Sequence, residues 1–145
     1  MTTSSRLSLG SALGFLLLVL APVTHADEAL TARNKAIVED FYTTVFIGRN
    51  IDAAPKFLSP EYIQHTPSVP SGLKAFMELF RPAFARKPPS DYKREILRIV
   101  GDNDIVIVFN RQSGTHPDGK HEVRLQFDMF RVENGMIVEH WDADT

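Results

Sequence analysis

The chain has 145 residues, of which 16 are Lys or Arg and 18 are Asp or Glu, so its formal net charge is −2. A slightly acidic chain of this size fits one domain, and it lacks the basic surface that nucleic acid or an anionic membrane would require. It contains no Cys, which excludes disulfides, a lipid-modified cysteine anchor and a cysteine nucleophile.

The first 26 residues have the composition of a secretory signal peptide. Arg6 precedes a short apolar run at residues 13–23, and small residues end at Ala26. The run is shorter than the roughly 20 apolar residues of a membrane span, although an uncleaved anchor is the alternative. We therefore expect residues 1–26 to be removed on export, and residues 27–145 to form a single periplasmic or secreted domain without membrane contact.

The expected mature domain begins with helical patterns. Apolar residues recur every third or fourth position over residues 30–46, which predicts an amphipathic helix with Tyr42 at the edge of its apolar stripe. Residues 51–58 predict a second, short helix, and residues 61–66 predict a short strand. Residues 73–84 predict a third helix with a kink or break near its Pro82, because Pro lacks a backbone donor.

Strand patterns fill the second half of the chain. Residues 92–100, 104–111, 121–132 and 136–143 predict four strands that follow one another as a meander, separated by Gly- and Asn-containing turns. Helices followed by such strands are typical of an α+β fold. We expect a curved antiparallel sheet that the N-terminal helices cover on one face.

The turn of the last hairpin decides which side chains share a face. A two-residue loop at residues 134–135 would place Asp128 opposite Trp141 and turn His140 to the other face. A three-residue loop at residues 133–135, with a left-handed Gly in a bulge, would place Asp128 opposite His140. We favour the second register, because Glu at its first position and Gly at its last suit that loop. That register also places Gln126 opposite Asp142.

Two motifs carry a resemblance to a known family. Residues 127–142 combine Asp-x-Phe-Arg, a Gly-containing turn and Ile-Val-Glu-His-Trp-Asp, and residues 62–67 are Tyr-Ile-Gln-His-Thr-Pro. Both resemble motifs of the SnoaL-like proteins, polyketide cyclases and their relatives, in the nuclear transport factor 2-like or ketosteroid isomerase-like superfamily. The resemblance implies a half-open, cone-shaped sheet around an internal pocket.

The resemblance also suggests roles for three residues. Asp128 matches the carboxyl that supports the substrate oxyanion in ketosteroid isomerases, or an acid–base group in the cyclases. Tyr42 matches a tyrosine that donates a hydrogen bond to the same oxyanion. Thr66 occupies the place of the isomerases' general base, which it cannot replace, so isomerisation by their mechanism is not expected.

The predicted site follows from these patterns. The predicted catalytic residues are Asp128, His140, Asp142 and His65, because carboxyl and imidazole groups exchange protons near neutral pH. The predicted substrate-binding residues are Tyr42, Tyr62, Gln64, Phe109, Gln126 and Phe130. Strand alternation puts His65 on the face opposite Gln64, so its place in the pocket stays open. No close-spaced histidine pair is present, so no metal or other cofactor is expected.

Three functions fit this site. The first is a cofactor-free enzyme that acts on a small hydrophobic carbonyl compound by aldol cyclisation, isomerisation, or hydrolysis or hydration. The second is a non-catalytic module that binds a small hydrophobic ligand, and the third is a scaffold with a vestigial pocket. A homodimer is expected, because Trp141 on the outer face of the sheet suits an interface.

Overall fold

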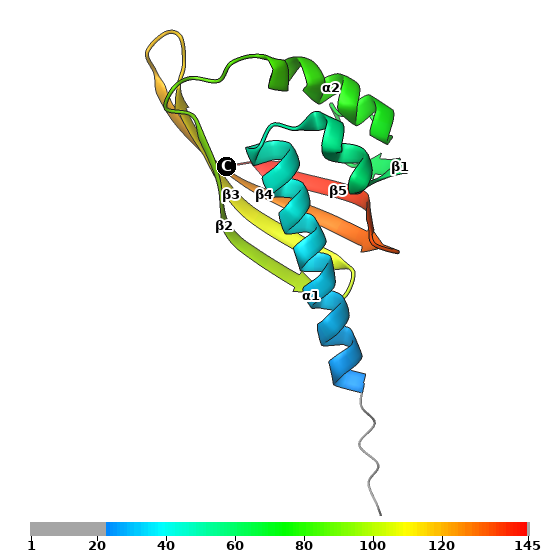
Figure 1. The fold of residues 1–145 in the computed structure, drawn as a ribbon. Coiled ribbons are helices and arrows are strands. Elements are labelled where there is room, and N and C mark those ends of the chain that lie inside the picture. The colour runs from blue at the N-terminus through cyan, green and yellow to red at the C-terminus, as the bar shows by residue number, and fades with distance from the viewer. Residues whose placement is uncertain (1–22, 145) are drawn as a thin grey trace, which may run out of the picture.

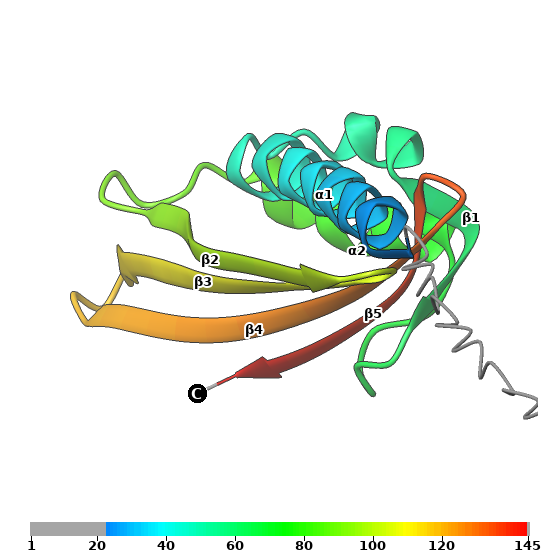
Figure 2. The same cartoon turned by 90° about the horizontal axis from the view of Figure 1, so that it is seen from below.

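A curved sheet with helices on its concave face makes up residues 23–144, the part of the chain that the computed structural model describes (Figures 1 and 2). The N-terminal part contains α1 (Val23–Phe41), the π-helical turn η1 (Tyr42–Ile47), the 3₁₀ helix η2 (Ile51–Lys56), β1 (Leu58–Gln64) and α2 (Leu73–Ala85). The C-terminal part contains β2 (Lys93–Asp102), β3 (Ile105–Thr115), β4 (His121–Glu133) and β5 (Met136–Asp144). The predicted α+β fold is confirmed.

Within the described residues, the sheet has the strand order β1-β5-β4-β3-β2. Strands β2 to β5 form the expected antiparallel meander, but β1 lies parallel to β5. The sheet is therefore mixed rather than antiparallel throughout. Because the meander leaves the far edge of β5 unpaired, β1 satisfies backbone groups that would otherwise form an open edge.

The expected leader lies largely outside the described residues, which begin at Val23. In the described part, α1 runs without interruption across the expected cleavage point after Ala26. No helix among residues 23–144 is both long enough and apolar enough to cross a membrane.

The first helix departs from the predicted pattern near Tyr42. The α-helix ends at Phe41, and the chain continues as the wider turn η1, in which Tyr42 and Val45 are both buried. The turn ends at Gly48, where a Cβ atom would lie 2.7 Å from the carbonyl oxygen of Thr44. Wide π-helical turns often occur at functional sites, and this one directs Tyr42 toward the sheet.

The second long helix is not broken at its proline, because α2 continues through Pro82 to Ala85. Its Phe76 packs against Phe41 of α1, with ring centroids 6.2 Å apart. Phe41 also meets Phe130 of β4 edge to face at 5.8 Å. These rings join both helices to the inner face of the sheet, so the core lies between the two layers.

The last hairpin has a different register from the one predicted. Asn134 and Gly135 have positive φ angles of 51° and 81°, and Glu133 pairs with Met136. This is a two-residue loop of the type that Asn-Gly favours, so the predicted three-residue loop is wrong. The bulge lies instead within β5, where the pairing shifts by one residue at Val138.

The bulge determines which residues meet across the hairpin. Asp128 lies opposite Asp142, and Phe130 lies opposite His140. Gln126 faces Asp144 rather than Asp142. The predicted cross-strand partners are therefore wrong. Asp128 and His140 nevertheless share the inner face of the sheet, as diagonal neighbours.

Candidate functional site

A cavity of about 200 Å³ lies between the helices and the inner face of the sheet. One side of its wall is aromatic and contains Phe41, Phe46, Phe76, Phe80 and Phe130. Its polar end contains Gln64, Gln126, Asp128, His140 and Asp142. An aromatic wall with a few converging polar groups is the usual form of a small-molecule site.

Asp128 is the centre of the polar end. It is 5% exposed, and its two carboxyl oxygens have four partners. Tyr42 Oη and Asn110 Nδ2 donate to Oδ2 over 3.2 Å and 2.7 Å. Gln126 Nε2 donates to Oδ1 over 3.2 Å, and His140 Nε2 lies 3.0 Å from the same oxygen. The carboxyl is thus held in one orientation by groups from η1, β3, β4 and β5.

The hydrogen bonds around His140 indicate where its protons lie. Gln64 Oε1 accepts from the backbone N–H of Thr66 over 3.1 Å, so it is an acceptor. It lies 3.0 Å from Nδ1 of His140, which must therefore carry a proton. The 3.0 Å contact between Nε2 and Asp128 Oδ1 then needs exactly one more proton between them. The pair is either a carboxyl group beside a neutral imidazole or a carboxylate beside an imidazolium.

Two tyrosine hydroxyls close to Asp128 are kept neutral. Burial, and after it the nearby charge of Asp128, raises the pKa of Tyr42 far above its usual value. The same two causes raise the pKa of Tyr62, whose hydroxyl accepts a hydrogen bond from Gln64 Nε2 at 3.3 Å. Both phenols therefore remain protonated across the physiological range.

Asp142 lies at the exposed edge of the same cluster. Its Oδ1 accepts a hydrogen bond of 2.5 Å from Thr66 Oγ1, so the residue in the place of the isomerases' base orients a carboxylate here. One ligand atom each from Asp128, His140 and Asp142 lies within 4.8 Å of the others, which is close enough to hold a metal ion. A cation there would compete with the donors that already bind Asp128, and the absence of a metal stays a prediction.

Two predicted site residues lie outside the cavity. His65 stacks on Trp141, with ring centroids 4.3 Å apart, and its Nε2 lies 2.8 Å from Glu139 Oε2. Phe109 stacks on Phe127 at 4.5 Å. Side chains alternate along a strand, and both residues fall on the outer face of the sheet. We therefore remove His65 from the candidate catalytic residues and Phe109 from the candidate substrate contacts.

The predicted site omitted several residues, and two of them matter most for its polar groups. Asn110 is fully buried behind Asp128, and Arg94 lines the cavity. Asn110 is a polar residue at an inward-facing position of an apolar strand, and that pattern is the signal that could have identified it. Arg94 alternates with Lys93 and Glu95 in a charged segment, so no pattern in the sequence distinguishes it from a surface residue.

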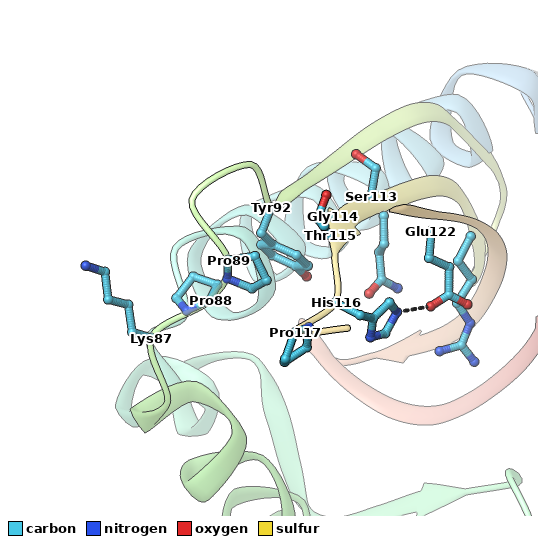
Figure 3. Close-up of a pocket in the computed structure, with 12 residues that line it drawn as sticks. Lys87, Pro88, Pro89, Tyr92, Ser113, Gly114, Thr115, His116, Pro117 and Glu122 are labelled. Atoms are coloured by element: carbon cyan, nitrogen blue, oxygen red, sulfur yellow. Dashed lines mark hydrogen bonds and ion pairs between the residues drawn. The ribbon is translucent and has the colours of Figure 1, made fainter. Parts of the chain in front are cut away.

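A wider groove of about 690 Å³ lies beside the cavity. Gln112 and Arg124 line both spaces. Figure 3 shows Pro88, Pro89 and Tyr92 on one side of this groove, facing the hairpin end that carries His116. The groove has mainly apolar walls, and no buried acid–base pair is among its lining residues, so the inner cavity is the better candidate for acid–base chemistry.

The chain is similar to known proteins of one family. Residues 36–144 match the model of the SnoaL-like polyketide cyclases. None of the curated proteins compared with the chain is similar enough to match it.

Solved structures show the same fold at low sequence identity. TsrD from Streptomyces laurentii is 20% identical, with a TM-score of 0.65 over 78% of this chain and 88% of that one. IdmH from Streptomyces antibioticus is 20% identical, with a TM-score of 0.64 over 77% and 91%. An LEH-like epoxide hydrolase from M. tuberculosis is 16% identical, with a TM-score of 0.62 over 79% and 84%. Because the family model covers most of the chain, the protein belongs to the SnoaL-like polyketide cyclase family.

Proposed function

We propose that this protein is an acid–base enzyme that needs no cofactor and acts on a small hydrophobic carbonyl compound. The observation that carries this proposal is the 3.0 Å contact between Asp128 Oδ1 and His140 Nε2 at the polar end of an aromatic-walled cavity. A buried pair that holds one proton can both give and take it, which general acid–base catalysis requires.

The chemistry that fits such a pair is proton transfer next to a carbonyl group. In an aldol step, a proton leaves the carbon beside one carbonyl, and that carbon bonds to a second carbonyl carbon. The oxygen of the second carbonyl then takes up a proton, so acid and base both act in one turnover. The Asp128–His140 pair is the proton donor and acceptor, and Asp142 is a second carboxylate at the same end.

We propose that Tyr42 and Gln64, which the sequence suggested as substrate contacts, act instead on the acid–base pair. Both are hydrogen-bonded to the pair itself, Tyr42 to Asp128 and Gln64 to His140. We therefore assign them as positioning residues, which hold the carboxyl and the imidazole in their productive orientation.

The test is the exchange of carbon-bound hydrogen in a ketone. We would follow deuterium uptake by 2-tetralone, a small aromatic ketone, by NMR in D₂O with the wild type, Asp128→Asn and His140→Ala. We expect each variant to slow exchange by about 100-fold or more, the usual contribution of a positioned acid or base. Asp104→Asn and His121→Ala remove the same groups from exposed positions, and both should exchange at the wild-type rate.

Two outcomes would contradict the enzyme. Unchanged exchange in both Asp128→Asn and His140→Ala would show that the pair does not move the proton. Binding of 2-tetralone without exchange by the wild type would favour a binding module.

Export and dimerisation belong to the same proposal. We propose that residues 1–26 direct the chain to the periplasm or the medium, supported by their signal-like composition. Mass spectrometry of the exported protein should find Asp27 at its N-terminus. We also propose that the outer face of the sheet forms a homodimer, supported by its exposed Phe127 and by Trp141.

A further inference from the structure

Arg94 is a cation that lines the cavity and has no carboxylate partner among residues 23–144. It lies on β2 opposite Gln112, on the inner face of the sheet, and is half-buried. Its guanidinium carbon lies 4.8 Å from the centre of the Phe46 ring and 5.7 Å from that of Tyr42. Its Nε is buried and has no hydrogen-bond partner.

The carboxylates around Arg94 already have other partners. Its neighbour Glu95 pairs with Arg111 on the outer face. Asp128 has four hydrogen-bond partners, and Asp142 accepts from Thr66. Among residues 23–144, no ion pair joins Arg94 to an acidic side chain.

Among the described residues, the buried Nε of Arg94 lacks an acceptor. The aromatic rings attract the charge of the guanidinium through their faces. They offer no acceptor to its N–H groups, which point outward in the plane of the guanidinium. A buried donor without an acceptor costs free energy, and a ligand carboxylate would supply two oxygens in the geometry that the fork matches. The aromatic faces also hold the guanidinium in place, so little conformational entropy is lost on binding.

We propose that Arg94 binds a carboxylate of the substrate, so that the substrate is a hydrophobic keto acid. Tyr42 connects the two ends of the site, because its ring lies under Arg94 and its hydroxyl binds Asp128. A substrate whose carboxylate and carbonyl are a few bonds apart would reach both groups. The position of the carbonyl rests on the proposed function, whereas the carboxylate contact stands on Arg94 alone.

The experiment compares a keto acid with its neutral ester. We would titrate 4-oxo-4-phenylbutanoate and its methyl ester into the protein by isothermal titration calorimetry. The wild type should bind the acid about ten- to a hundredfold more tightly, as expected for charge-assisted hydrogen bonds. Arg94→Gln should bind both probes equally, and Arg94→Lys should keep part of the preference. Arg98→Gln is the matched control, because Arg98 lies on the same strand opposite Phe109 and is exposed.

The wild-type comparison needs no variant, so it stands even if Arg94→Gln does not fold. Equal affinity of the wild type for acid and ester, or no binding of the acid at millimolar concentration, would overturn the proposal. A preference for the acid that persists in a folded Arg94→Gln variant would overturn it as well. These outcomes differ from failure of the proposed function, which appears as unchanged deuterium exchange in the Asp128 and His140 variants.

Discussion

The hydrogen bonds of Asp128 predict that two substitutions at this position differ sharply in stability. In Asp128→Ala, Tyr42 and Asn110 lose the oxygen that accepts from both of them inside the core. In Asp128→Asn, the remaining oxygen can take that place, and the amide nitrogen can donate to Nε2 of His140. Nε2 can accept, because the proton of the neutral imidazole lies on Nδ1 beside Gln64.

The expected magnitudes follow from the number of groups left without a partner. Each buried polar group that loses its partner costs about 1–3 kcal/mol, so the loss at Tyr42 and Asn110 together should lower the free energy of unfolding of Asp128→Ala by about 2–6 kcal/mol. Asp128→Asn leaves only a donor–donor contact with Gln126, which is half-buried and free to turn toward water. The free energy of unfolding of Asp128→Asn should therefore fall by less than about 1 kcal/mol. For a domain of this size, 1 kcal/mol corresponds to roughly 4 °C in Tm.

Urea unfolding, followed by the fluorescence of the single Trp and by circular dichroism, measures both free energies. Asp104→Asn and Asp104→Ala are controls at an exposed position and should change stability by less than about 0.5 kcal/mol. If Asp128→Asn loses as much as Asp128→Ala, then Nε2 of His140 is a donor only, and our proton assignment is wrong. If the free energy of unfolding of Asp128→Ala falls by less than about 1 kcal/mol, water reaches the polar end of the cavity and replaces the lost acceptor.

Three further predictions concern other parts of the molecule. Because burial raises the pKa of Tyr42 and Tyr62 above their ordinary 10.0, the unfolded chain releases these protons first. The stability that these two tyrosines contribute should thus be fully present below about pH 10 and be lost as the pH rises above it. If the tyrosinate absorbance rises fully before the circular dichroism changes, this prediction is wrong. Phe127→Glu on the outer face should convert the proposed dimer to a monomer in light scattering, whereas Leu79→Glu, equally exposed at 44%, should not; a wild type that is monomeric at micromolar concentration would exclude the dimer. Gly135→Ala should cost about 1 kcal/mol in urea unfolding, because φ at this residue is +81°.

Local patterns in the sequence were sufficient for much of the fold. Apolar spacing indicated the helix that ends near Tyr42, and alternation indicated the strands of the meander. These patterns depend on residues a few positions apart, so they can be recognised without knowing how the rest of the chain folds. The motifs at residues 62–67 and 127–142 indicated the family, which the match over residues 36–144 confirmed.

Other features depended on contacts between distant segments. The parallel pairing of β1 with β5 joins residues more than 70 positions apart, and no local pattern reports it. The partner-free Nε of Arg94 is visible only once Phe46 and Tyr42 lie beneath the guanidinium. The position of His65 also depended on such a contact, because it stacks on Trp141, which lies on the outer face of the sheet.

The last hairpin shows most clearly which features the sequence alone could predict and which it could not. Its residue pattern predicted two strands joined by a tight turn, and its motif resembled that of the SnoaL-like family. Which residues face Asp128 was decided by packing. Ile137 and His140 are three positions apart, and in a regular strand they would point to opposite faces. Both are buried on the inner face, against Val132 and Phe130, and only the extra residue of the bulge allows this.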